Sequence, residues 1–160
     1  MSEAKHLAEG VSGFLTNTEN GWFDCLPYAV DGLTAKQAAQ IPSKGFNSIW
    51  QVVEHMRYWH DFFLLRLQGV EKPDLGADWA PIPVPNDEVA WKAALDRLYE
   101  TNKRLCTVIE SLPDPKLDEE VAPGKPRYFQ IFQGALAHNS YHICEVITIR
   151  HMLGLWLERT

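Results

Sequence analysis

The repeat of apolar side chains constrains this 160-residue chain more than any other feature of its sequence. In four segments, apolar residues recur every three or four positions, which is the spacing of one face of an α-helix. These segments cover about 5–30, 48–68, 87–111 and 127–154. We find no convincing alternation of the kind that marks β-strands, so the sequence predicts an all-α protein.

The four segments differ in how clearly they carry this pattern. The clearest stripe, in 87–111, consists of Trp91, Leu95, Leu98, Asn102, Leu105, Ile109 and Leu112. The stripe of the first segment consists of Leu7, Val11, Phe14, Thr18, Trp22, Cys25 and Ala29. That first helix is the weakest, because it contains three glycines and because Pro27 kinks or ends a helix.

Glycines, prolines and capping residues mark the connections. A helical turn is expected near Thr34, Asn47 or Ser48 caps the second long helix, and Gly69 ends it. Residues 71–86 and 113–126 hold four prolines each and therefore form long loops, and Trp79 suggests that the first loop packs against the protein. Helices of this length span about 33 to 40 Å. The sequence thus predicts one domain over 1–160, an up-and-down-type four-helix bundle with long proline-rich connections.

Two histidines stand in the apolar stripe of the last segment. His138 and His142 are four residues apart, so they lie on one helix face, and Glu145 shares that face. Polar groups in the middle of an apolar stripe cost free energy unless they are satisfied. One metal ion held by both imidazoles would satisfy them. The same spacing also arises by chance, and a core histidine is often only hydrogen-bonded, so the pair alone leaves both readings open.

A third histidine lies on the core face of the second long helix. His55 shares its stripe with Ser48, Gln51, Val52, Trp59, Phe62 and Leu65. Taken alone it is more typical of a structural residue, but three imidazoles with an open position are the ligand set of a catalytic metal. By the helical count, His60 and His151 each point about 140° away from these stripes, and His6 is close to the N-terminus. We expect these three at the surface or in a second layer.

Three stretches together resemble the DinB/YfiT-like family of metal-dependent proteins. They are NSIWQVVEHMRYWHDFFLLRLQG, AHNSYHICEVITIRHMLG and the connector GLTAKQAAQIP. The resemblance implies a four-helix bundle, often a homodimer, that binds a divalent ion such as Zn or Ni through three histidines. At matching positions these are His55, His138 and His142. Some relatives transfer low-molecular-weight thiols such as bacillithiol or mycothiol, or isomerise maleylpyruvate.

The sequence departs from the family pattern at one place. Cys144 and Glu145 replace a Gly-Gln pair. Glu145 could orient an imidazole or act as a general base on a metal-bound nucleophile, and an interhelical hydrogen bond is an equal alternative. Cys144 lies off the metal stripe and is expected to be a packed thiol.

Composition limits the partners. The net charge of −6, without clustered Lys or Arg, argues against nucleic acid and an anionic membrane surface. No apolar stretch reaches the roughly 18 residues of a membrane span, and the N-terminal residues carry no secretion signal. Three widely spaced cysteines form neither a disulfide framework nor a CxxC zinc site, which favours the cytoplasm.

Three functional hypotheses compete on these observations. The first is a metal enzyme that activates a thiol or water. The second is a non-catalytic metal or ligand-binding module, and the third is a bundle whose histidines are only buried polar groups. For the first, Asn102 either lines the pocket or is a core polar residue. Arg57, Arg66 and Arg150 are candidates for holding the carboxylates of a thiol cofactor.

Overall fold

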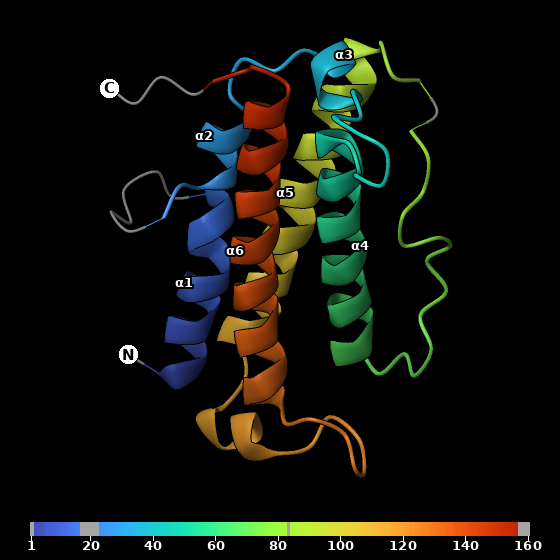
Figure 1. Ribbon diagram of the computed structural model, residues 1–160. Helices are drawn as coiled ribbons and strands as arrows, with labels where there is room; N and C mark the ends of the chain where they lie inside the picture. Colours follow the sequence, from blue (N-terminus) through green and yellow to red (C-terminus); the bar gives the residue numbers. More distant parts are fainter. Residues whose placement is uncertain (1, 17–22, 83, 157–160) are drawn as a thin grey trace.

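The computed structural model describes residues 2–16, 23–82 and 84–156, and over these ranges it contains helices and no β-strand (Figure 1). The four long helices are α1 (Glu3–Thr16), α4 (Ile49–Leu67), α5 (Glu88–Glu110) and α6 (Tyr128–Met152). Three short elements join them: α2 (Leu26–Val30), α3 (Ala35–Ala38) and the 3₁₀ helix η1 (Asp114–Asp118). The predicted all-α fold is confirmed.

Each long helix packs against two others, in the cyclic order α1, α5, α4, α6, which makes a four-helix bundle. Figure 1 shows that α4 and α5 run in the same direction, whereas α1 and α6 run the opposite way. The connection between α4 and α5 must therefore return along the whole length of the bundle. This crossover, residues 68–87, is the first of the two predicted proline-rich loops.

The predicted length of the first helix is wrong. It was expected to run to about residue 30, but α1 ends at Thr16 and residues 23–25 are not helical. Pro27 occupies the first turn of α2, where its missing N–H costs nothing, so it starts a new helix rather than kinking an old one. Thr18 and Trp22 of the predicted stripe lie outside the described residues.

The other helix boundaries follow the predicted signals. Thr34 and Ser48 each form a capping box, and the Ser48 hydroxyl accepts a hydrogen bond from the backbone N–H of Gln51. Asp87 caps α5. Gly69 and Gly154 follow α4 and α6 with φ angles of 89° and 73°, a conformation that glycine adopts without strain.

The interior is divided into two apolar clusters. One contains Met56, Leu98 and Ile143, and the other contains Leu105 and Ala135. Between them in the sequences of α4, α5 and α6 stand three fully buried polar residues, His60, Asn102 and Asn139. The His60 Nε2 donates to Asn139 Oδ1 at 2.8 Å, and the Asn139 amide donates to the carbonyl oxygen of Val11 on α1. A buried polar layer thus ties three helices together halfway along the bundle.

Candidate metal centre

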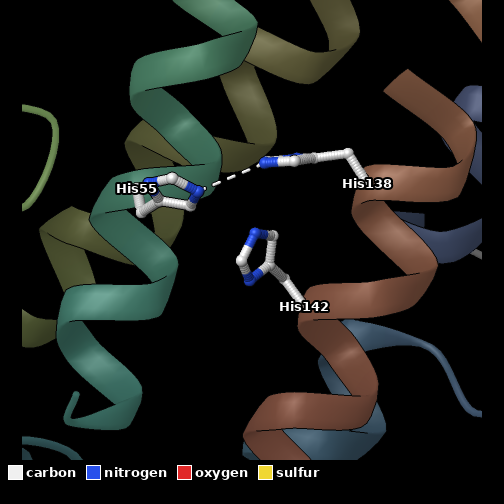
Figure 2. Close-up of side chains that lie close together, drawn as sticks. All are labelled: His55, His138 and His142. Carbon is white, nitrogen blue, oxygen red and sulfur yellow. Dashed lines mark hydrogen bonds between the residues drawn. The ribbon is translucent and has the colours of Figure 1, made fainter. Parts of the chain in front are cut away.

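Three imidazoles meet beside this polar layer, in the contact between α4 and α6 (Figure 2). His55 projects from α4, and His138 and His142 project from successive turns of α6. One ring nitrogen from each residue lies within 4.8 Å of the other two, and the Nε2 atoms of His55 and His138 are 3.2 Å apart. His55 and His142 are buried, and His138 is half-buried. The structure therefore brings together all three histidines that the sequence singled out.

Two of the imidazoles are oriented by carboxylates. The Nδ1 of His55 lies 2.6 Å from Asp78 Oδ1, and the Nδ1 of His142 lies 2.7 Å from Glu145 Oε2. A carboxylate accepts a hydrogen bond, so the neutral imidazoles carry their proton on Nδ1. That tautomer leaves the Nε2 lone pair of each ring free. The carboxylate–histidine arrangement is the one that fixes imidazole ligands around metal ions.

His138 has no such partner. Its Nδ1 is buried and makes no hydrogen bond within the described structure. Burial, with further contributions from His142 and His55, lowers the pKa of His138 to about 3. Burial and His142 also lower the pKa of His55, although Asp78 acts in the opposite direction. Both rings are neutral at pH 7 and so retain lone pairs for a cation.

The geometry fits a divalent ion. Two nitrogens that each lie about 2.1 Å from a tetrahedral ion are about 3.4 Å apart, which is close to the 3.2 Å between His55 and His138. Because Asp78 fixes the proton of neutral His55 on Nδ1, the Nε2–H of His138 donates to the Nε2 lone pair of His55, the contact drawn dashed in Figure 2, and a bound divalent ion would take the place of that proton. Three imidazole donors leave one coordination position for another ligand, and nitrogen ligands suit both zinc and nickel.

Aromatic rings enclose the cluster. Trp79, in the crossover, stacks on His55 with a centroid separation of 3.9 Å and an interplanar angle of 11°. Trp59, one turn after His55 on α4, lies edge-on to the ring of His138 at 6.3 Å. The proline-rich loop thus packs onto the protein through Trp79, as its sequence suggested. These rings limit the access of water to one side of the site.

Several secondary predictions are resolved by the positions of these residues. Cys144 is exposed on the outer face of α6, so its assignment as a packed thiol is wrong. His6 is exposed, and His151 lies against Trp156 at the end of α6. Of His6, His60 and His151, only His60 lies behind the cluster: it is fully buried, and it is hydrogen-bonded to Asn139 rather than to the three clustered histidines.

Asn102, Arg57 and Arg150 have partners or positions outside the histidine cluster. Asn102 is fully buried in the polar layer, which agrees with a core polar residue. Arg57 pairs with Glu54 and Asp61. Arg150 donates to the carbonyl oxygens of Ala29 and Leu155, so it fastens the end of the bundle and is not free to bind a substrate.

Sequence reasoning missed Asp78. It stands between prolines in a loop with no repeating pattern, so nothing in the local sequence fixes its direction. The one usable signal was its neighbour: because Trp79 was expected to pack against the protein, the carboxylate before it would also lie near the surface of the bundle. From the sequence alone, nothing showed whether Asp74 or Asp78 of this loop forms the hydrogen bond to His55.

Fold and cluster together define a helical bundle with a three-histidine site that can hold a metal ion. A family model described as the DinB superfamily matches residues 22–145, and the chain belongs to that superfamily. No curated protein and no solved structure matches the chain. Among the described residues, no helix is both long enough and apolar enough to cross a membrane.

Asp78 gives a direct test of the site. Replacing it by alanine (Asp78→Ala) removes the carboxylate that fixes the His55 ring, and we expect the affinity for zinc to fall by about 10- to 100-fold. The affinity is measured by competition with a chromophoric chelator. Asp74→Ala, in the same loop, is the matched control, because Asp74 Oδ1 accepts only from the backbone of Gly76. Equal zinc affinity in the two variants would contradict the assignment.

Stability of the metal-free protein should depend on pH through His60. Burial lowers the pKa of His60 to about 4, against 6.5 when the chain is unfolded. The folded state is therefore favoured fully above pH 6.5 and loses stability as the pH falls toward 4, by about 1.4 kcal/mol per pH unit for this group. Urea unfolding in chelator at pH 6.5, 5.75 and 5 measures the slope. His60→Gln, which cannot titrate, should lower the slope by about 1.4 kcal/mol per pH unit and leave the part that comes from His138 and His55, whose pKa values are also lowered. An unchanged slope would refute this origin.

Proposed function

We propose that the protein binds one divalent ion, zinc or nickel, through His55, His138 and His142 and uses it in an enzymatic reaction of a low-molecular-weight thiol. The observation that carries the proposal is the convergence of three ring nitrogens, two of them presented by carboxylate partners. A divalent ion at this place lowers the pKa of a coordinated thiol or water, which supplies a nucleophile at neutral pH. Thiol chemistry is suggested by the resemblance to DinB-like proteins.

The chain's own residues supply positioning and exclusion of water. Asp78 and Glu145 hold the rings of His55 and His142 so that both lone pairs point at one place. Trp79 covers His55, and Trp59 borders His138. In such an enclosed site a charge on sulfur or oxygen interacts more strongly with its surroundings than it does in water.

Glu145 is the one candidate for proton transfer in the proposed reaction. Its side chain keeps about a quarter of its surface exposed, so one carboxylate oxygen can face solvent while the other bonds His142. A carboxylate in this position can accept the proton that a thiol or water loses on activation. Glu145 can both orient His142 and accept a proton. Glu145→Gln separates these roles, because an amide oxygen still accepts the hydrogen bond from His142 but cannot act as a base.

A non-catalytic binding module is the second candidate. The observation that favours it is the close stacking of Trp79 on His55, which leaves less of the cluster open to a substrate. In that case the protein would hold its ion in a closed shell without turnover. The experiment below distinguishes the two functions.

The test measures metal content and thiol transfer together. Protein purified without a nickel column should contain close to one equivalent of zinc or nickel. It should accelerate the reaction of bacillithiol, mycothiol or glutathione with monochlorobimane, in which a C–S bond forms and chloride leaves. Chelation or His138→Ala should remove both metal and rate, and His151→Ala is the matched control. Glu145→Gln should keep metal and lose rate if Glu145 takes the proton.

Each contrary result has a definite meaning. A full equivalent of metal without turnover supports the binding module. Less than a tenth of an equivalent contradicts any metal function and leaves a bundle with buried polar histidines. A rate that survives removal of the metal contradicts the enzymatic proposal.

We further propose that the protein is a homodimer, as the DinB resemblance implies, and that it is cytoplasmic, as its three widely spaced cysteines favour. Exposed apolar side chains that a second copy would cover include Phe23 and Tyr141, which border a hollow on the outer face of α6. We expect light scattering to give about twice the 18.3 kDa mass of one chain. Tyr141→Glu should shift the mass toward that of one chain if this face is the interface. A single-chain mass for the wild-type protein would refute the dimer.

A further inference from the structure

A cavity of about 560 Å³ opens between the end of α4 and the start of α6, away from the histidines. In Figure 1 these two helix ends lie at the same end of the bundle. Phe62, Phe63 and Leu67 of α4 line the cavity together with Tyr128 and Ile131 of α6. Its volume lies in the range of pockets that bind small molecules, and its walls are mostly apolar.

This cavity lies in the same inter-helix groove as the metal centre. Ile131 precedes His138 by seven residues, which is two turns or about 10 Å along α6. Trp59 lies between them on the α4 side, with its ring centred 6.3 Å from that of His138 and 5.3 Å from that of Phe62. On the α6 side stands Gly134, where an added Cβ would meet nothing within 4 Å. The α6 side is therefore open at Gly134, at a level between Ile131 of the cavity and His138.

The rim of the cavity carries positive charge. Arg66, Lys72 and Lys125 contribute three cations, against the single carboxylate of Glu71, in a chain whose net charge is −6. Lys72 and Lys125 are exposed and form no ion pair with any described residue. Arg66 donates to the carbonyl oxygens of Glu71 and Val70, so it also holds this wall in place. An anion at the rim would find two uncommitted ammonium groups.

We propose that this cavity binds a small amphipathic carboxylate, with the carboxylate at Lys72 and Lys125 and the apolar body lying toward Trp59. Neither feature alone selects such a ligand: the aromatic walls would take any apolar molecule, and the lysines would attract any anion. Their combination selects a molecule that has both parts. The further step, that this molecule is the second substrate of the metal centre, rests on the proposed function.

Octanoate is the probe for binding. We expect calorimetry to show that the protein binds octanoate at least about tenfold more tightly than 1-octanol, and that it does not measurably bind octyltrimethylammonium. Lys72→Glu combined with Lys125→Glu should weaken octanoate binding about tenfold or more and change 1-octanol binding less than twofold. Both lysines are exposed, so the variant should fold. Lys103→Glu, at an exposed position on α5, is the matched control.

A separate experiment tests where bound octanoate lies relative to the three histidines. His138→Ala should lose zinc and keep octanoate, whereas the double lysine variant should lose octanoate and keep zinc. In protein loaded with Co²⁺, paramagnetic broadening of octanoate should be stronger at the terminal methyl than at the methylene next to the carboxylate.

Several outcomes would overturn the proposal. Equal affinity for octanoate and 1-octanol, or unchanged octanoate binding in the double lysine variant, would refute the carboxylate site. Broadening that is strongest next to the carboxylate would refute the orientation. Loss of metal function with octanoate binding intact would leave the cavity as a binding site and remove only its role as a substrate site.

Discussion

Buried imidazoles cost free energy unless their nitrogens find partners, and the contacts that they make organise the middle of the bundle. His55 and His142 satisfy their Nδ1 atoms with Asp78 and Glu145, and His60 satisfies its Nε2 with Asn139. A polar group left unpaired in this interior costs on the order of 1–3 kcal/mol, so each of these bonds matters to folding as well as to the site. The Nδ1 atoms of His138 and His60 lack hydrogen-bond partners among the described residues, and the His138 ring faces the cluster. The candidate metal site thus contains a buried nitrogen that the described residues leave unsatisfied.

The bundle fixes the positions of the two helices that carry the histidine cluster. Apolar packing above and below holds α4 and α6 at a fixed separation, and the bond from Asn139 to Val11 fastens α1 to the same level. Because His55, His138 and His142 come from only two helices, their separation depends on the α4–α6 contact. Rigid helices on which the ligands sit give a more precise site than loops would.

The sequence predicted the helices better than the connections. Periodic apolar residues mark helix faces directly, so α4, α5 and α6, and the histidines of α4 and α6, could be placed from residue spacing. The break between α1 and α2 was harder, because Pro27 can either kink a helix or start one, and the apolar spacing continues across it. Cys144 was misplaced because the helical count gives its angle from His138 but not which neighbour covers that angle. Asp78 could not be placed at all, since loop residues obey no period.

The crossover between α4 and α5 makes the candidate metal centre a composite of two kinds of structure. The three histidines belong to helices whose sequence is restricted by packing, whereas the carboxylate that holds His55 and the ring that covers it belong to a loop of residues 68–87. Loops tolerate substitution, insertion and deletion far better than packed helices do. The affinity and openness of the site can therefore change through this loop while the ligand set stays the same. Such a division allows the surroundings of the three histidines to vary through a single external segment.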